Sequence, residues 1–328
     1  MIKVEGLSKR YARTLAVDNI SFEVEKGQIV GFLGPNGAGK TTTMRVLTCF
    51  LPPSSGKASV AGFDVLENPL EVKKRIGYLP ETPPLYPEME VVEYLTFVGK
   101  LKGISRDIGH RVDEVMERCA ISDVRSKLIG NLSKGYRQRV GIAQAIIHNP
   151  DVLVLDEPTA GLDPKQIIHI RELLRALAAE HTIILSTHIL SEVENSCERV
   201  IIIDAGKVVA NDSLANLTNR PREPEAVVLE VEAANGQPAA TEVQHRLEQV
   251  SGVGRVVPAD PANGRLAFQV EALQGRSIRS DLARSVVSAG WNLREMRALG
   301  LTLEEIFLHL TGAEAQESAR QEKEGGKE

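Results

Sequence analysis

The chain has 328 residues, which is enough for two domains or for one large one. Its formal net charge of −5 argues against a strongly basic nucleic-acid binder, and its 4% aromatic residues argue against an RNA platform that stacks bases. Hydrophobic residues make up 42% and charged residues 25%, as in an ordinary globular protein, and no segment approaches the roughly 20 apolar residues that cross a bilayer.

Up to about residue 217, short β-rich runs alternate with amphipathic helical patterns, which predicts an α/β sheet flanked by helices. One such pair is the apolar strand Ile29–Leu33 and the helical run Thr42–Leu47. The residues between them match the phosphate-loop pattern G-x-x-x-x-G-K-[ST] in full: Gly34, Pro35, Asn36, Gly37, Ala38, Gly39, Lys40 and Thr41. This context predicts a P-loop NTPase domain.

The chemistry of phosphate binding explains these residue types. Glycines let successive backbone N–H groups surround phosphate oxygens, and the start of the following helix adds partial positive charge. Lys40 is expected to reach the β- and γ-phosphates of a nucleotide, and Thr41 is expected to bind Mg²⁺. The alternative is a glycine-rich turn with a solvated lysine.

Between Pro80 and Pro150 the sequence pattern becomes helical. Val91–Leu101 and Val112–Cys119 carry apolar residues at helical spacing. We therefore predict a helical insertion in the sheet domain, over about residues 81–149.

Two later strands are each followed by side chains suited to nucleotide chemistry. The apolar run Val152–Leu155 leads into Asp156, which suits a Mg²⁺ site, and Glu157, a candidate for polarising an attacking water. An ordinary acidic strand-to-loop turn is the alternative. His188 follows the strand Thr182–Leu185, at a carboxyl strand end where ligands bind in α/β sheets.

The composition changes after Asn216. Residues 218–224 contain two prolines and no core candidates, so we predict a linker, followed by a small α+β domain over 225–312. Its expected order is strand, helix, strand, strand, helix, strand, the ferredoxin-like βαββαβ arrangement: Ala226–Val231, Ala240–Val250, Gly254–Pro258, Arg265–Val270, Ser280–Ala289 and Leu293–Ala298. An amphipathic helix, Leu303–Leu310, follows, and the tail over 313–328 is predicted to be disordered.

Three further motifs complete the pattern of a known family. Leu132-Ser133-Lys134-Gly135-Tyr136-Arg137-Gln138 lies between the phosphate loop and the acidic strand end. Pro158-Thr159-Ala160-Gly161-Leu162-Asp163 and Ser186-Thr187-His188 follow that strand end. With these motifs, residues 1 to about 215 resemble the nucleotide-binding subunit of an ABC (ATP-binding cassette) transporter. The sequence of the first motif is similar to that found in the ABC-2 type export branch of this family. The same is true of Leu303–Leu308, near the end of the chain.

The resemblance implies roles for individual residues in binding and hydrolysing ATP. Tyr11 would stack on adenine, the loop from Gly34 to Thr42 would hold the phosphates, and His188 would contact the γ-phosphate and the attacking water. Ser133 and Gly135 would contact the γ-phosphate bound by the opposite subunit, and Asp163 would couple the two sites. Purely structural alternatives remain open for Tyr11, for Ser133 as a helix N-cap and for Asp163 as a turn carboxylate.

The chain departs from the consensus sequence of the family at three positions. Glu81 stands where glutamine is usual, and a carboxylate there still offers an oxygen to Mg²⁺, so we keep Glu81 as a metal-binding and catalytic candidate. Lys134 and Tyr136 stand where glycine and glutamine are common. Lys134 adds a positive charge either near the opposite nucleotide or in solvent.

The resemblance also implies partners. Each motif is present once, so a homodimer with two equivalent sites is the simplest assembly. An integral membrane permease would dock a short helix in a groove beside the Glu81 loop, against the apolar residues Pro83, Pro84, Leu85, Tyr86, Pro87 and Met89. A proline-rich loop with no partner is the alternative. The chain would then work in the cytoplasm, at the inner face of the cell membrane, without nucleic acid.

The expected function is therefore an ATP-hydrolysing subunit that powers a separate export permease. A soluble ABC ATPase not coupled to transport is the alternative. The DNA-repair class of such ATPases needs a long coiled coil, yet no sustained heptads lie between Thr41 and Asp156. The ribosome-associated class carries two cassettes in one chain, and a non-enzymatic regulator would lack Glu157 and His188.

Overall fold

The computed structural model describes residues 1–219, 224–233, 239–259, 266–273 and 275–312. Its contacts divide the chain into two compact units, the first formed by Met1–Leu214 with residues 307–312 and the second by Ala215–Ile306. Residues 220–223 of the predicted linker, and the predicted tail, lie outside the described residues. In the parts that are described, no helix combines the length and the apolar sequence that a membrane span requires.

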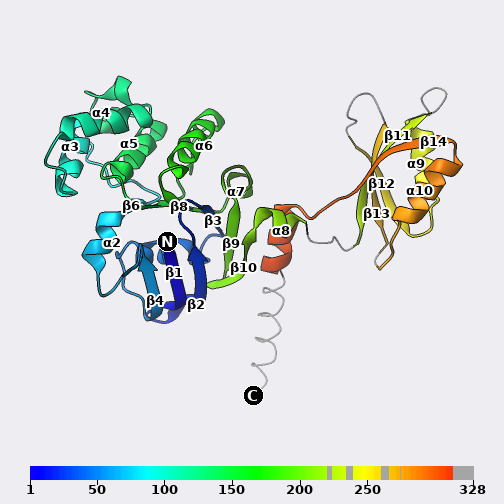
Figure 1. Ribbon diagram of the computed structural model, residues 1–328, viewed down its shortest axis with the longest axis horizontal. Coiled ribbons are helices and arrows are strands. Elements are labelled where there is room, and N and C mark those ends of the chain that lie inside the picture. The colour runs from blue at the N-terminus through cyan, green and yellow to red at the C-terminus, as the bar shows by residue number, and fades with distance from the viewer. Residues whose placement is uncertain (220–223, 234–238, 260–265, 274, 313–328) are drawn as a thin grey trace, which may run out of the picture. The chain divides into compact units, whose positions relative to one another are not determined.

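The first unit alternates strands and helices along the chain (Figure 1). Its strands are β1 (Ile2–Tyr11), β2 (Thr14–Val24), β3 (Ile29–Leu33), β4 (Ser55–Val60), β5 (Phe63–Asp64), β6 (Ile76–Leu79), β7 (Val152–Asp156), β8 (Thr182–Thr187), β9 (Arg199–Asp204) and β10 (Lys207–Ser213). Its helices are α1 (Lys40–Leu47), α2 (Pro69–Arg75), α3 (Val91–Leu101), α4 (Ile108–Arg118), α5 (Lys134–Ile146), α6 (Pro164–Ala178) and α7 (Leu190–Ser196). Short 3-10 turns cover Ser122–Val124 and Ile129–Asn131, and α8 (Leu214–Thr218) follows β10.

The strands of the first unit form two sheets. The six-stranded sheet has the order β10-β9-β3-β8-β7-β6 and confirms the predicted α/β fold. In addition, β2-β1-β4-β5 form an antiparallel sheet. Strand β1 turns back into β2 at Ala12, whose φ is 45°, and pairs along its other edge with β4. Phe22 of one sheet and Phe32 of the other lie with ring centroids 5.5 Å apart in the buried core that includes both sheets.

The topology of the larger sheet sets the position of the candidate site. Strands β3, β8, β7 and β6 are neighbours and run parallel to one another. All four therefore present their carboxyl ends at the same edge of the sheet, where ligands bind in α/β folds. Each of these ends leads into one of the sequence motifs, so chain segments distant in sequence are brought together there.

The predicted helical insertion is confirmed as a group of three helices between β6 and β7. Helices α3, α4 and α5 gather together in Figure 1. Helix α4 begins at Ile108 rather than at the predicted Val112, since its first turn carries few apolar residues to mark it. Helix α5 approaches β6 so closely that a Cβ atom added to Gly77 would overlap the carbonyl oxygen of Ala145. The two backbones are in direct contact at that point.

The second unit has the predicted order of elements. These are β11 (Ala226–Ala233), α9 (Ala240–Glu248), β12 (Val253–Ala259), β13 (Leu266–Ala272), α10 (Arg279–Ser288) and β14 (Trp291–Ala298). Their sheet has the order β12-β13-β11-β14, and every neighbouring pair is antiparallel. Leu229 and Phe268 from the sheet pack with Val243 of α9 and Leu282 of α10 in a separate buried core.

A final helix covers residues 303–312 and confirms the predicted amphipathic helix. Leu303 and Ile306 are buried, while Leu308 is 61% exposed. The contacts of residues 307–312 group them with the first unit, whereas the sequence predicts them in the second domain.

Candidate functional site

The phosphate loop follows β3 and ends at the first turn of α1, as the motif requires. Gly39 has a φ of 105°, and a Cβ atom added there would lie 2.5 Å from the carbonyl oxygen of Ala16. Only glycine fits this position, because L side chains rarely adopt that φ and no space is left for one. The loop therefore holds its backbone in a curled form in which N–H groups can point toward an anion.

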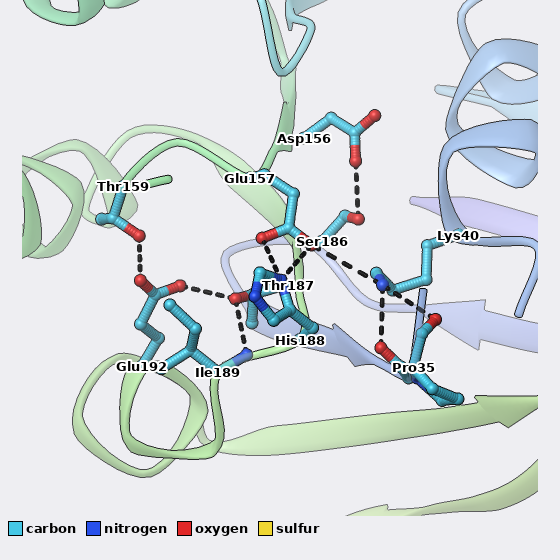
Figure 2. Close-up of polar contacts among 11 residues, drawn as sticks. Pro35, Lys40, Asp156, Glu157, Thr159, Ser186, Thr187, His188, Ile189 and Glu192 are labelled. Atoms are coloured by element: carbon cyan, nitrogen blue, oxygen red, sulfur yellow. Dashed lines mark hydrogen bonds and ion pairs between the residues drawn. The ribbon is translucent and has the colours of Figure 1, made fainter. Parts of the chain in front are cut away.

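Lys40 is buried at the start of α1, with 6% of its surface exposed. Its ammonium group donates hydrogen bonds to the carbonyl oxygens of Gly34, at 2.8 Å, and Pro35, at 3.2 Å (Figure 2). The same nitrogen lies 3.6 Å from Oε1 of Glu157. A buried cation needs such partners, because an unpaired charge in the interior is very costly.

Glu157 follows β7 in an unusual backbone conformation. Its φ is 50°, in the left-handed region that costs a non-glycine residue about 1–3 kcal/mol. Its N–H donates to the carbonyl oxygen of Ser186 at the end of β8, at 2.9 Å. The side chain, 8% exposed, has its carboxylate beside Lys40 and His188.

The imidazole of His188 completes this group. Its Nδ1 atom lies 2.9 Å from both carboxylate oxygens of Glu157. Because an ionised carboxylate only accepts hydrogen bonds, this arrangement assigns the hydrogen to Nδ1. The His188 side chain is 45% exposed, so the ring connects a buried carboxylate to the open side of the site.

Asp156 has one carboxylate oxygen that lacks a partner. Its Oδ1 atom accepts a hydrogen bond from the Ser186 hydroxyl at 2.7 Å, whereas its buried Oδ2 atom has none. Burial raises the pKa of Asp156, the hydroxyls of Ser186 and Thr41 oppose this, and the negative charges of Glu157 and Glu81 add to it. A buried carboxylate oxygen without a partner, beside a threonine hydroxyl, fits a Mg²⁺ ion that takes its remaining ligands from phosphates and water.

That donor set is compatible with magnesium but not with a metal held by protein side chains alone. Throughout the described ranges, no group of three or more His, Cys, Asp or Glu side chains is arranged to hold a metal ion. Mg²⁺ commonly binds through one or two carboxylates together with substrate phosphates.

A pocket of about 320 Å³ opens between these motifs. The predicted residues Asn36, Gly37, Gly39, Lys40, Thr41, Thr42, Glu81, Glu157 and His188 line it. Ala16 and Ala160, to which the sequence assigns no role, also line it. Gly34 and Pro35 take part through their carbonyl oxygens, and the buried Ala38 donates its N–H to the carbonyl oxygen of Pro35.

Besides Gly34, Pro35, Ala38 and Asp156, four predicted residues do not line this pocket. Tyr11 is 39% exposed, with the Lys9 ammonium group 5.5 Å from its ring centroid. Ser133 is the N-cap of α5, where its hydroxyl accepts a hydrogen bond from the N–H of Tyr136 at 3.4 Å. Asp163 is the N-cap of α6 and accepts from the N–H of Gln166 at 3.0 Å.

Gly135 is the fourth of these residues. It packs so closely that an added Cβ would overlap the side chain of Gln166. Ser133, Gly135 and Asp163 therefore have structural roles in the single chain, and these roles leave Ser133 and Asp163 exposed.

The loop that follows Glu81 carries an exposed aromatic group. Tyr86 is 47% exposed and meets Tyr94 and Phe97 of α3 edge-on, at centroid distances of 6.0 and 5.9 Å. Of the other residues predicted to contact a permease, Pro84 and Pro87 are exposed, whereas Pro83, Leu85 and Met89 are partly buried.

Sequence reasoning assigned no role to a buried polar network behind His188. Glu192 of α7 accepts hydrogen bonds from the hydroxyls of Thr159 and Thr187, as Figure 2 shows. Thr159 and Thr187 lie in motifs that the sequence revealed, but nothing in the sequence pattern pairs them with Glu192. That pairing depends on how α7 packs against β3 and β8.

Comparisons with known proteins agree with this geometry. The family model described as "ABC transporter" matches residues 17–160. A second model, described as "AAA domain, putative AbiEii toxin, Type IV TA system", matches residues 128–194. The first match spans the phosphate loop, the helical insertion and the acidic end of β7.

Relatives and a solved structure extend the match. The chain is 42% identical over 230 residues to "ABC transporter ATP-binding protein NatA" of Bacillus subtilis, covering 68% of this chain and 93% of that protein. It is 33% identical over 327 residues to "Daunorubicin/doxorubicin resistance ATP-binding protein DrrA" of Streptomyces peucetius, covering 98% and 95%. A dimeric structure of a bacterial ABC transporter cassette, MJ0796, matches with a TM-score of 0.61 at 25% identity, covering 65% and 99%. This chain therefore belongs to the ATP-binding subunits of ABC transporters.

Proposed function

We propose that this chain hydrolyses ATP at the pocket beside Lys40, Glu157 and His188, and that two copies act together to drive a separate membrane permease. The observation that carries the proposal is the convergence of these three side chains, with Glu157 3.6 Å from Lys40 and 2.9 Å from His188. A cation, a carboxylate and an imidazole in contact supply charge stabilisation, a proton acceptor and a positioned hydrogen-bond donor.

In this proposal the phosphate loop binds the triphosphate. Backbone N–H groups of the loop and the Lys40 ammonium group would offset its negative charge, and Thr42 would add a hydroxyl at the pocket wall. Thr41, Asp156 and Glu81 would hold a Mg²⁺ ion, which supplies charge neutralisation for the β- and γ-phosphates. Tyr11 would present its exposed ring to the adenine base.

Glu157 would accept a proton from the attacking water. The water oxygen forms a bond to the γ-phosphorus while the bond to the β–γ bridging oxygen breaks, so ADP leaves and phosphate is formed. His188 would keep the Glu157 carboxylate oriented through Nδ1 and present its exposed edge toward the γ-phosphate. General-base help of this kind typically contributes about 10²–10⁴ in rate.

A second copy of the chain would complete each site. Ser133 and Asp163 are exposed and do not line the pocket of their own chain. We propose that Ser133 and Gly135, at the start of α5, contact the nucleotide of the partner, and that Asp163 couples the two sites. The matching structure of the MJ0796 cassette is dimeric, which supports a homodimer here.

The permease would be an integral membrane protein that docks beside the Glu81 loop. The exposed ring of Tyr86, with Phe97 next to it, offers an apolar surface for a short helix. Because DrrA is named for drug resistance, we propose export as the direction of transport and the inner face of the cell membrane as the place of work.

Co-purification tests the coupling to a permease. Tagged chain is isolated from its host in mild detergent, and ATP hydrolysis is measured before and after the bound membrane protein is removed. We expect an integral membrane protein in the complex and faster Mg²⁺-dependent hydrolysis in its presence. Purification without any integral membrane protein, at full ATPase activity, would support the alternative of an uncoupled ATPase.

A further inference from the structure

A carboxylate outside the proposed catalytic group is buried directly behind it. Glu192 lies in α7 with 3% of its surface exposed. Glutamate is almost never buried this far unless it is paired, since an isolated carboxylate in the interior is costly. The contacts that keep the Glu192 side chain in this position therefore indicate its role.

Both carboxylate oxygens of Glu192 are occupied. One accepts a hydrogen bond from the hydroxyl of Thr159, and the other accepts from the hydroxyl of Thr187 at 2.7 Å. The Thr187 oxygen itself accepts a hydrogen bond from the N–H of Ile189 at 3.0 Å. Thr187 therefore has its own hydrogen available for Glu192, and the direction of each bond is defined.

The two threonines belong to the segments that carry the proposed catalytic pair. Thr159 lies two positions after Glu157 on the loop that follows β7, and Thr187 directly precedes His188 at the end of β8. Figure 2 shows Glu192 between these two hydroxyls, close to the Glu157–His188 contact. One buried side chain thus joins the backbone segments from which Glu157 and His188 extend.

The surroundings of Glu192 shift its pKa in both directions, with a net increase. Burial raises its pKa, the Thr187 hydroxyl opposes this, and the nearby Glu157 raises the pKa further. His188 and Arg171 act in the opposite direction. Two hydroxyl donors aimed at two oxygens favour the carboxylate form, which can only accept.

We propose that Glu192 is a positioning residue that sets the geometry of the Glu157–His188 pair by holding Thr159 and Thr187 together. This inference rests on the proposed function, in which that pair acts on the attacking water. Misplacing a catalytic group by about 1 Å can reduce a rate by about 10²-fold, so loss of the link should lower the rate of hydrolysis.

The first test replaces the carboxylate without changing its size. Glu192→Gln cannot accept from both hydroxyls at once, because its amide nitrogen is a donor. We expect kcat for ATP hydrolysis to fall by about 10-fold, while KM and nucleotide affinity stay within about 2-fold of the wild type. Glu194→Gln, an exposed change on the same helix, is the control and should leave all three values unchanged.

A second pair of variants separates positioning from folding. Thr187→Val keeps the branched shape but removes the hydroxyl, whereas Thr187→Ser keeps the hydroxyl. If Glu192 acts by holding Thr159 and Thr187 together, Thr187→Val should lower kcat. Thr187→Ser should keep kcat near the wild-type value, and the two variants should have similar melting temperatures. In the Glu192→Gln background, Thr159→Val should have little further effect, because residues that act as one unit are not additive.

The wild type and Glu157→Gln serve as controls that distinguish failure of the positioning role from failure of the proposed function. If the wild type hydrolyses ATP, Glu157→Gln does not, and folded Glu192→Gln and Thr187→Val both retain the wild-type kcat, the positioning role is wrong. A helix-stabilising role alone would lower the melting temperature without changing kcat, which also overturns the inference. If the wild type itself is inactive, or if Glu157→Gln is as active as the wild type, the proposed function fails instead.

Discussion

The imidazole of His188 and the carboxylate of Glu157 are in contact across the ends of two adjacent strands, with Nδ1 2.9 Å from each carboxylate oxygen. Neither residue needs a flexible loop to reach the other, because β7 and β8 are paired up to Asp156 and Ser186. The sheet itself therefore holds the two side chains together. Because the contact joins two defined side chains, the contribution of each can be tested by substitution.

Replacing Glu157 by glutamine should separate binding from hydrolysis. The variant keeps the size of the side chain but loses the proton acceptor, so we expect hydrolysis to fall by about 10²–10⁴. ATP should still bind, and size-exclusion chromatography with Mg²⁺ and ATP should show an accumulated dimer. Glu117→Gln, exposed on α4, is the matched control. A Glu157→Gln protein that turns over at the wild-type rate would remove Glu157 from its proposed role.

Truncating Lys40 should abolish nucleotide binding. Lys40→Ala removes the only side-chain ammonium that lines the pocket among the described residues, and it leaves the Glu157 carboxylate without its cation. We expect the affinity for ATP to weaken by about 10²-fold or more in calorimetric titration, with the circular dichroism spectrum retained. Lys74→Ala, whose side chain is 68% exposed, should bind ATP normally. Unchanged affinity in Lys40→Ala would contradict a phosphate-binding role for the loop.

Glu81 should be replaceable by glutamine. Both side chains offer an oxygen at the pocket wall, but glutamine carries no charge beside the triphosphate. We expect Glu81→Gln to hydrolyse ATP within about 3-fold of the wild-type rate and to bind metal-free ATP more tightly. A folded variant without activity would show that the carboxylate does more than substitute for the amide.

The second unit should unfold without loss of nucleotide binding. Phe268 is 1% exposed in its separate core, and removing such a ring costs about 3–5 kcal/mol. Phe268→Ala should therefore lower the unfolding temperature of that unit and open it to proteolysis, while ATP affinity stays within about 2-fold. Leu273→Ala, at a side chain that is 55% exposed, is the control. Equal loss of ATP binding in Phe268→Ala would show that the units do not fold separately.

His148 should make the fold sensitive to acid. Burial, with a smaller effect of Lys102, lowers the pKa of His148 from 6.5 to about 4 in the folded chain. Between these two values the unfolded chain takes up a proton that the folded chain does not, so stability decreases as the pH falls from about 6.5 toward 4.

Urea unfolding at pH 7 and pH 5 measures this effect. His148 Nε2 donates to the carbonyl oxygen of Ile76, and glutamine can replace that bond. We expect His148→Gln to lose less stability than the wild type between the two pH values. His110→Gln, at an exposed position, should behave like the wild type. An identical loss in all three proteins would exclude His148 as the cause.

The parts of the fold that follow local rules were predictable. The strand, loop and helix around Lys40 are visible in the sequence because glycine spacing and apolar runs act over a few residues. The helix Val91–Leu101 was predicted to the residue, since its apolar spacing is a local signal. In the second unit the predicted and observed elements differ by at most a few residues at their ends.

The parts that depend on packing were not predictable. No local signal indicates that Glu157 adopts a φ of 50°, or that Glu192 bonds to Thr159, because each depends on elements distant in sequence. The separate antiparallel sheet of β1, β2, β4 and β5 is likewise a result of long-range pairing between β1 and β4. Sequence identified the chemical groups, and tertiary structure determined which of them meet.

The direct contact between α5 and β6 at Gly77 has a mechanical consequence. Helix α5 is a rod of 13 residues, about 20 Å long, with the Ser133 cap at one end and Ala145 against the β6 backbone near the other. With no side chain between helix and strand, there is nothing at that point to deform and absorb a displacement. We expect a displacement of β6 at Gly77 to be transmitted along α5 as the tilt of a rigid lever, so that the Ser133 cap at the far end moves with it.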